Sequence, residues 1–577
     1  MLNTKTPFVP SNTRAPLTPT QWLVCVIAAV GFLFDTYELL MTPLVGVPAI
    51  AELLQVPPNN PAVTFWTGRL LWLSALSGGV FGLLGGWLID RFGRKRIMAA
   101  SIFVYSLSPV ASGLSTTLGA FIFFRCATFI GVCVEFVAAI TWLAELFPDP
   151  QRKKVVLGST QAFASVGGLF VTGVNAWVVG HANTLPGLPL PEIFNAHATW
   201  RYALFTGLAP AVLIAFLLPF VPESQVWREK RQQGTLKRPS FAELFAPELR
   251  RVTLVTALLS ACAYAAAFGA LQLTPLRITP GVPELADQRK ALKPLRDEAT
   301  QLNAQLNGIM PAFREAEKNI PGFASLATDR AATRIRQRAA RKANDKEALA
   351  KLAAHFSELD TNLAQLTASQ PEARKTMLER ERLMKSIGDN RDAQAPFDTA
   401  VKARGNVMQS YQESGGLVGR IILAILLVTA ISHRALLRLF VVPGLVMFPL
   451  TYFVFYHDGG PAMQWGIFFC GLMVVAQFSY FGEYLPKAFP LHLRGTGGSF
   501  ATNVGGRMLG TSAAFLTTNL IAPMVGAKST FDSVAIAAGI VGTAVFLIAA
   551  VATSLLPEPS AEAEGINAEP AEIAQKR

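Results

Sequence analysis

Ionisable side chains stand inside long apolar stretches of this sequence, and they are its clearest candidates for chemistry. Asp35 and Glu38 lie three residues apart in Phe-Asp-Thr-Tyr-Glu, on nearly one face of a helix. Arg125 lies in another apolar stretch, and Glu135 follows it ten residues later. A charge in the hydrocarbon of a bilayer costs several kcal/mol, so we interpret these residues as functional candidates.

An acid beside an arginine provides a protonation switch. Without the proton the ion pair holds one conformation, and with the proton the pair weakens and packed helices can move. If the two stretches cross a membrane in opposite directions, Glu38 and Arg125 lie at similar depth. Two questions stay open. The alternative to a protonation switch is that the Glu38–Arg125 pair is a static tether between helices. For Glu135, the alternatives are a second proton site and a packing acid paired with another helix.

Two further arginines, Arg420 and Arg507, lie within apolar stretches and have no acid beside them in the local sequence. The planar fork of an arginine binds a carboxylate through two hydrogen bonds. Arg420 is also close enough to the end of its stretch to extend to the interface, and Arg507 could pair with an acid across the bundle. The side chains expected to flank a bound anion are Tyr37, Gln161, Tyr264, Phe268, Tyr480 and Asn503, each with helix packing as its alternative role.

The composition predicts an all-α membrane protein with many spans. Of the 577 residues, 51% are hydrophobic and only 15% are charged, against about 25% charged in soluble proteins. The net charge of +13 falls in short loops, so we expect no nucleic-acid surface. All five cysteines lie in apolar stretches without paired spacing, which predicts neither disulfides nor a metal site.

Twelve apolar runs have the length of a membrane span. They are residues 21–45, 66–89, 97–118, 120–147, 155–180, 199–221, 252–275, 414–432, 436–456, 462–485, 498–524 and 531–556. Basic loops alternate with polar ones, and the positive-inside rule then places both termini in the cytoplasm. We expect tails at 1–20 and 557–577, six-helix units at 21–221 and at 252–280 plus 414–556, and a cytoplasmic linker at 222–251.

A long hydrophilic segment, residues 281–413, interrupts the second half. It holds 22 Lys/Arg and 18 Asp/Glu and is expected outside the cytoplasm, because long domains are translocated regardless of charge. Heptad spacing occurs twice, from Leu295 to Ile309 and from Leu349 to Leu366, with Pro311 and Pro321-Gly322 after the first run. Each run is too short for an oligomeric coiled coil, so we favour an intramolecular helical hairpin.

The turn Gly85-Gly-Trp-Leu-Ile-Asp90-Arg-Phe-Gly93-Arg-Lys-Arg96 resembles the loop between helices 2 and 3 of the major facilitator superfamily of secondary transporters. Within that superfamily, Phe34-Asp35-x-Tyr37-Glu38 is similar to a signature of aromatic-acid and related carboxylate:proton symporters. Arg125 to Pro148, and Pro-Glu-Ser-x-x-Trp at 222–227, resemble sugar porters and their organic-ion relatives. Spans 4 and 10 both end in Glu-x-x-Pro, at Glu145 and Glu483. We recognise no family in residues 281–413.

The resemblance implies two six-helix bundles, a central site and alternating access. By it, Asp35 and Glu38 couple protons with Arg125 as their partner, and charged loop residues hold the outward-open state. The expected cytoplasmic gate consists of Gly86, Asp90, Arg91, Gly93, Arg94, Glu145 and Arg152, with Arg434, Glu483 and Arg494 as its second-half counterpart. Span 7 departs from the family because it lacks the Gln-Gln…Asn run that binds hexoses in sugar porters.

We therefore expect a proton-coupled carrier that imports a small organic anion and works as a monomer in a cell (inner) membrane. A sugar or polyol porter is the alternative in the same class. A transporter-like receptor, with a protein partner for 281–413, is the alternative in another class. The sequence contains no phosphate-binding loop, so we predict no ATP-driven pump, no enzyme and no cofactor beyond the proton.

Overall fold

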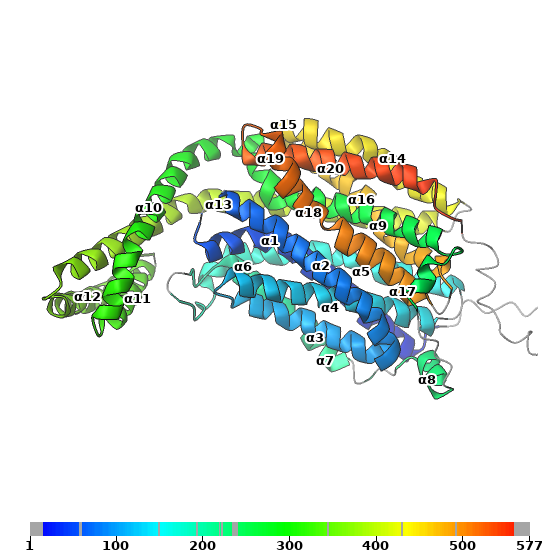
Figure 1. Ribbon diagram of the computed structural model, residues 1–577, viewed down its shortest axis with the longest axis horizontal. Helices are drawn as coiled ribbons and strands as arrows, with labels where there is room; N and C mark the ends of the chain where they lie inside the picture. The colour runs from blue at the N-terminus through cyan, green and yellow to red at the C-terminus, as the bar shows by residue number, and fades with distance from the viewer. Residues whose placement is uncertain are drawn as a thin grey trace, which may run out of the picture.

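The structure is a computed structural model that describes residues 16–56, 60–147, 150–191, 194–217, 220, 223–233, 240–342, 345–427, 431–490 and 493–558. Throughout these residues the regular elements are helical (Figure 1). The predicted tails therefore fall largely outside the described residues.

The first half of the chain folds into long helices joined by short turns. They are α1 (Pro19–Leu54), α2 (Pro61–Phe92), α3 (Arg94–Gly113), α4 (Leu118–Leu146), α5 (Pro150–His181), η1 (Ala182–Thr184), α6 (Thr199–Phe205), η2 (Thr206–Leu208), α7 (Ala209–Leu217) and α8 (Gln225–Gln232). The start of α1 is determined by its sequence, because Thr18 and Gln21 form a capping box around Pro19.

The second half begins with η4 (Ala242–Phe245) and α9 (Arg250–Gly269), followed by η5 (Leu271–Leu273), η6 (Thr274–Ile278), η7 (Thr279–Gly281) and η8 (Pro283–Leu285). Next come α10 (Ala286–Asn319), α11 (Phe323–Lys342), α12 (Lys346–Leu366) and α13 (Pro371–Leu426). The last elements are α14 (His433–Pro449), η9 (Leu450–Phe455), α15 (Tyr456–Asp458), α16 (Gly460–Ala488), α17 (Arg494–Ser499), η11 (Phe500–Gly510), α18 (Ala513–Phe515), η12 (Leu516–Ile521), α19 (Ala522–Val525) and α20 (Thr530–Thr553).

Nine helical segments among the described residues are long and apolar enough to cross a membrane. They are 19–54, 62–89, 118–143, 156–181, 250–281, 433–458, 460–485, 495–525 and 530–553, and each overlaps a predicted span. The other three predicted spans fall on α3, on α6 with α7, and on the end of α13. α6 and α7 are only 7 and 9 residues long, and the end of α13 contains Glu413 and Arg420. The protein is an integral membrane protein, and the count of twelve stays a prediction.

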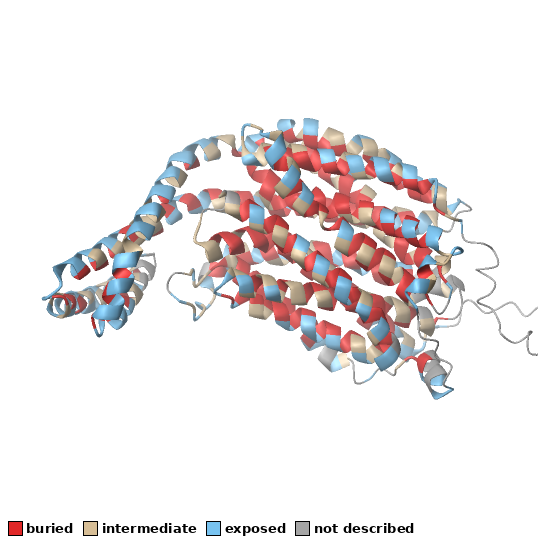
Figure 2. Cartoon of the chain, in the orientation of Figure 1, coloured by how far each residue is buried: buried red, intermediate tan, exposed pale blue. Residues whose placement is uncertain are grey.

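Each half has its own hydrophobic core. One core is built from buried side chains of α1 to α6. The other is built from side chains of η4 to α20, with Leu71 of α2 packed into it (Figure 2). The basic turn between α2 and α3 lies at one end of the molecule together with α8, and the helices of segment 281–413 project from the opposite end (Figure 1). Which end faces the cytoplasm stays a prediction.

The segment 281–413 is more than a two-helix hairpin. It contains α10, α11, α12 and the first part of α13, and Pro311 lies inside α10 instead of ending it. At its far end, which we call the tip, α10 to α13 enclose a separate small core that includes Phe313, Phe323, Leu359 and Met377. In the tip, the buried Arg330 forms two ion pairs. Its Nε lies 2.5 Å from Oε1 of Glu381, and its Nη1 lies 2.5 Å from Oδ1 of Asp360. Burial disfavours the charge of Arg330, but these two acids outweigh it, and its pKa lies above the ordinary value.

The near end of the segment, which we call the root, belongs to the second half. Leu292 on α10 and Phe397 and Val401 on α13 are part of the core of that half. α13 continues through the predicted boundary at 413/414 as one helix of 56 residues. A rigid helix therefore connects the tip to the membrane-spanning part of the protein.

Candidate functional site

Asp35 of α1 and Arg507 of η11 form an ion pair that joins the two halves. Nη2 of Arg507 lies 3.2 Å from Oδ2 of Asp35, and the two side chains are 1% and 5% exposed. Arg507 also donates to Oδ1 of Asn503 (3.2 Å) and to the carbonyl of Val132 on α4 (3.4 Å). Its guanidinium lies over the ring of Phe136, 4.8 Å from the centroid. Among the described residues, the other carboxylate oxygen of Asp35 has no hydrogen-bond partner.

Glu38 and Arg125 form a second buried ion pair, and this pair lies inside the first half. Nη1 of Arg125 is 3.3 Å from Oε2 of Glu38, and Nη2 donates to the Glu38 carbonyl (3.0 Å) and to Thr42 (2.5 Å). Glu38 and Arg125, which the sequence places at similar depth, are thus in contact. Arg125 is not the partner of Asp35, however. A three-residue step leaves the two side chains about 60° apart around α1. Asp35 therefore contacts Arg507 of the other half while Glu38 contacts Arg125 of α4.

Glu135 is a third buried acid near this centre. It is fully buried on α4, and within the part of the chain that the structure describes neither carboxylate oxygen has a hydrogen-bond partner. A Cβ at Gly31 of α1 would lie 2.3 Å from its Oε1, so the glycine makes room for the carboxyl group. The charges of Asp35 and Arg507 both interact electrostatically with the carboxyl group of Glu135. Neither alternative for Glu135, a proton site or a paired packing acid, is decided by this geometry.

Tyr264 and Asn503 lie beside Arg507, whereas Phe268 and Tyr37 are held by packing. Tyr264 interacts with Arg507 and rests on Gly506 and Gly510 of η11. Phe268 is buried in the core of the second half, 6.2 Å from the Tyr264 ring. The Tyr37 hydroxyl bonds to Thr206, and its ring packs 5.6 Å from Phe170.

Arg420 and Gln161 form another contact between the halves. Nη1 of Arg420 donates to the backbone carbonyl of Gln161 on α5 at 2.5 Å. The side chain of Gln161 lies against Gly482 of α16. In this arrangement Arg420 contacts α5, and its predicted role in binding an anion stays a prediction.

The basic turn is organised by acids from α4 and from the segment before α8. Arg94 is bound on two sides by Glu145, with Nη2 to Oε1 at 2.8 Å and Nε to both oxygens at 3.1 Å. Glu145 also accepts from Ser224 (2.6 Å). Glu223 accepts from the backbone N–H groups of Arg94 (2.9 Å) and Lys95 (3.1 Å), a favourable place for an acid at the start of α3.

The other predicted gate residues of the first half differ in their surroundings. Arg91 is exposed and lies over Trp87, and a Cβ on Gly86 would meet nothing within 4 Å. The close approach to α4 occurs at Gly85 instead, against Val134. Gly93, between α2 and α3, has a φ of 101°, a backbone conformation that favours glycine. Arg152 is half-buried, and the side chains of Asp90 and Arg494 lie outside the described residues.

The second half repeats the arrangement of the basic turn with other partners. Glu483 pairs with His433 (3.7 Å) and with Lys487, whereas Arg434 pairs with Glu558 (3.9 Å). The sequence predicts Glu483, Arg434 and Arg494 as one group. The reason for the difference is that Glu558 accepts from the N–H groups of His433 and Arg434 at the start of α14, as Glu223 does at α3. The sequence contains a signal for both caps, since Pro-Glu occurs at 222–223 and again at 557–558.

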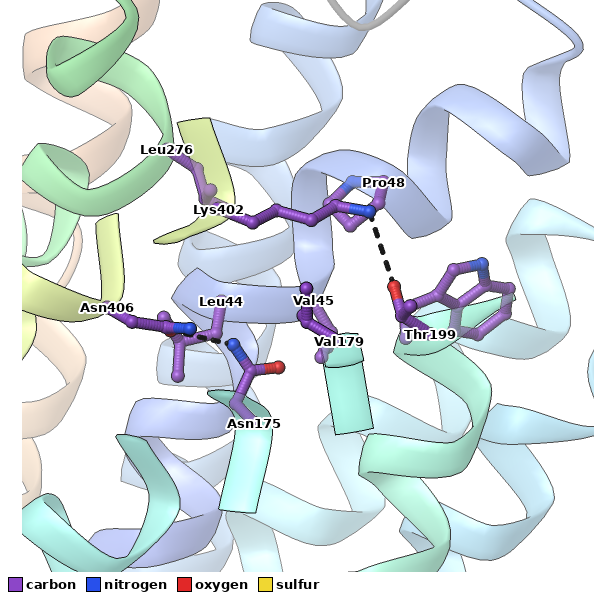
Figure 3. Close-up of a pocket in the computed structure, with 10 residues that line it drawn as sticks. Leu44, Val45, Pro48, Asn175, Val179, Thr199, Leu276, Lys402 and Asn406 are labelled. Atoms are coloured by element: carbon purple, nitrogen blue, oxygen red, sulfur yellow. Dashed lines mark hydrogen bonds between the residues drawn. The ribbon is translucent and has the colours of Figure 1, made fainter. Parts of the chain in front are cut away.

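A small pocket lies between the halves near the root of segment 281–413 (Figure 3). In it, Nδ2 of Asn175 on α5 donates to Oδ1 of Asn406 on α13 (2.9 Å), and Lys402 reaches Thr199 of α6 at 3.4 Å. Sequence reasoning missed these residues because it assigned Lys402 and Asn406 to the external segment. Together with the Asp35–Arg507 pair, they close the halves on each other.

Comparisons with known proteins agree with this architecture. Residues 22–288 match the family model "Major Facilitator Superfamily". The glucose transport protein of Synechocystis sp. is 34% identical over 28% of this chain and 34% of its own length. The cis,cis-muconate transport protein of Acinetobacter baylyi is 30% identical over 30% and 38%, and the sialic acid transporter NanX of Escherichia coli is 24% identical over 43% and 55%. The chain thus spans about one third to one half of the length of these curated relatives.

The solved structures extend the match to nearly the whole chain. The xylose transporter XylE from E. coli in an inward open conformation superposes with a TM-score of 0.53 and 14% identity over 95% of this chain and 99% of that one. A second structure, titled as the major facilitator superfamily proton:xylose symporter XylE, gives 0.54 at 15% identity over the same shares. Residues 22–288 thus match the model of the Major Facilitator Superfamily, and the chain as a whole shares the fold of these solved structures.

Proposed function

We propose that this protein is a secondary active transporter that moves a small carboxylate across the membrane together with protons, by alternating access. The observation that supports this most is the Asp35–Arg507 pair, which joins the two halves in the buried centre. Its arginine is the side chain best suited to bind a carboxylate. Asp35, the acid of the pair, competes with a substrate carboxylate for Arg507.

The competition gives a coupling scheme. While Asp35 is ionised, it occupies Arg507, and a substrate carboxylate meets both the repulsion of Asp35 and an occupied guanidinium. When Asp35 binds a proton, its hold on Arg507 weakens and the guanidinium is free for the incoming anion. A proton and a carboxylate therefore bind together. Asn503 and Val132 keep Arg507 in place during the exchange.

The Glu38–Arg125 pair supports a second role for protons within the first half. Both side chains are 1% exposed, so neither exchanges with water while the halves are closed. Protonation of Glu38 releases Arg125 from one of its bonds and loosens α1 against α4. We propose that Asp35 links the proton to the substrate, and that Glu38 links it to the movement of the helices.

A sugar substrate is the second candidate, and the relatives named for glucose and xylose favour it. The relatives named for muconate and sialic acid favour the carboxylate. The centre itself favours the carboxylate as well, because a buried arginine is a poor partner for a neutral polyol.

Uptake into proteoliposomes separates the two candidates. Purified protein is reconstituted, an inward pH gradient is imposed, and accumulation of cis,cis-muconate, sialic acid, glucose and xylose is measured. We expect accumulation of a carboxylate that disappears when a protonophore collapses the gradient. Accumulation of a sugar without any carboxylate would make the carboxylate assignment wrong, and no gradient-driven accumulation of any solute would count against proton symport.

A further inference from the structure

α5 and α13 form a seam between the two halves, with contacts that recur every seven residues. Residue numbers rise along α5 as they fall along α13, so the two helices run antiparallel, and seven residues correspond to about two helical turns. The middle contact differs from its neighbours because it places a carboxyl group at the seam. The three contacts are Gln161–Arg420, Gly168–Glu413 and Asn175–Asn406.

The carboxyl group of Glu413 is enclosed between the halves. Its side chain is 3% exposed, and its Oε1 accepts hydrogen bonds from the amides of Gln409 and Gln412, both at 2.9 Å. Its Oε2 faces Gly168 of α5, where an added Cβ would lie only 2.1 Å away. A glycine at this position of α5 is therefore what admits the carboxyl group.

Within the described parts of the chain, Glu413 makes no ion pair. Arg420 acts on it from two turns away along α13, and α5 presents Gly168 and Thr172 to the seam. α16 packs against this part of α13 through Phe468, Leu472 and Val475. The charged side chains of the neighbouring elements have other partners, namely Arg277 with Thr64, Arg296 with the Phe397 ring, Lys402 with Thr199, Arg404 with Glu284, and Glu483 with His433 and Lys487.

A carboxylate without a cation is expensive to bury, whereas a neutral carboxyl group needs only hydrogen bonds. Two amide donors satisfy one oxygen of Glu413, and among the described residues Oε1 of Gln409 is a buried acceptor without a hydrogen-bond partner. A proton on the carboxyl group of Glu413 adds a donor to this cluster. A bound metal cation would instead need several oxygen ligands around it, and the groups facing Oε1 are N–H donors.

We propose that Glu413 binds a proton while the α5–α13 seam is closed and releases it to water when the seam opens. In the opening step the carboxyl O–H bond breaks, water takes the proton, and the carboxylate that remains is hydrated in the open seam. Glu413 is then a proton-binding residue of the second half, in addition to Asp35 and Glu38 of the first half. This role rests on the proposed proton-coupled transport for its function, but the linkage between protonation and seam closure is separately measurable.

The test measures the width of the seam as a function of pH. Nitroxide labels are placed on exposed positions of the two halves, through Thr184→Cys beyond α5 and Lys290→Cys on α10, after the five native cysteines are replaced. Distances between the labels are recorded in nanodiscs from about pH 8 to about pH 5, the range in which buried carboxyl groups titrate. The variants are Glu413→Gln, Glu413→Asp and, as an exposed control on the tip, Glu358→Gln.

We expect the closed population of the wild type to grow as the pH falls. Glu413→Gln, which mimics the protonated form, should shift the population towards the closed seam at high pH and flatten the response. Glu413→Asp should restore the response, and Glu358→Gln should match the wild type. An unchanged pH response in Glu413→Gln, or closure by sodium ions at constant pH, would overturn the inference.

Uptake by the same proteins separates this inference from the proposed function. If the wild type accumulates a solute under a pH gradient while Glu413→Gln keeps the wild-type label response, only the Glu413 assignment fails. If the label response depends on Glu413 but no solute accumulates under the gradient, the transport proposal fails and the protonation of the seam stands.

Discussion

At the scale of single residues, the two acids of α1 differ in partner although they are three residues apart. The sequence identified Asp35, Glu38, Arg125 and Arg507 as candidates because charges in apolar helices are costly. It did not predict that Arg507 pairs with Asp35. Hydropathy and spacing assign a residue to a helix and a face, but they do not say which of the other helices lies opposite that face.

Replacing Arg507 by lysine tests the need for a planar fork at the centre. Arg507 serves Asp35, Asn503 and Val132 at once, and a single ammonium group does not reproduce that geometry. We expect Arg507→Lys to lower the initial rate of carboxylate uptake by about tenfold or more, the effect of losing ~1.4 kcal/mol of binding. Arg251→Lys is the control, because Arg251 makes one exposed bond to a carbonyl. Equal rates in the two variants would contradict the role of the fork.

Glu38→Gln tests the coupling role of the pair inside the first half. The glutamine keeps the shape of the side chain but neither ionises nor forms an ion pair with Arg125. We expect the variant to exchange labelled for unlabelled substrate across the membrane and to lose accumulation against a gradient. Uphill accumulation by Glu38→Gln at the wild-type level would mean that Glu38 is not a coupling acid and that the pair is a static tether.

At the scale of the helices, the nine apolar spans followed from hydropathy, whereas the end of α13 did not. Glu413 and Arg420 lower the hydropathy of that helix, so its boundary with segment 281–413 was predicted in the middle of a continuous helix. The polar residues that weaken the prediction are those that hold the α5–α13 seam. The same applies to Lys402 and Asn406, whose contacts depend on tertiary packing that no local pattern encodes.

Glycine substitutions on α5 test the tightness of the seam. Gly168→Ala places a methyl group against Glu413, whereas Gly173→Ala on the same helix meets nothing within 4 Å. We expect Gly168→Ala to destabilise the protein by about 1–3 kcal/mol, the usual effect of overpacking, and Gly173→Ala to leave stability unchanged or slightly raised. Thermal unfolding in detergent compares the two. Equal melting temperatures would show that the seam is loosely packed around Glu413.

At the scale of the whole molecule, the two halves contact each other through polar side chains such as Asp35 and Arg507, and segment 281–413 is attached to the second half. Its root shares the core of that half, whereas its tip has a core of its own. Because the tip has its own core, we expect it to fold independently of the central site and to be dispensable for transport.

Removing the tip alone tests this separation. Asn390 on α13 bonds to the Leu295 carbonyl (2.9 Å) and to Glu298 (2.8 Å) on α10, so replacing residues 305–380 by a short Gly/Ser linker keeps the paired root. We expect the variant to fold and to transport at the wild-type rate. Removing 284–410 instead takes away Leu292, Phe397, Lys402 and Asn406, and should abolish folding or closure. Loss of transport on removal of the tip alone would assign the tip a part in the cycle.

The central claim is that a proton and a carboxylate bind together at the Asp35–Arg507 pair. Proton influx into proteoliposomes that contain a trapped pH-sensitive dye measures it directly, when cis,cis-muconate is added outside without an imposed gradient. We predict that substrate addition acidifies the lumen for the wild type, and that Asp35→Asn abolishes this substrate-driven acidification. Substrate uptake by the wild type without acidification, or acidification by Asp35→Asn equal to that of the wild type, would contradict the account.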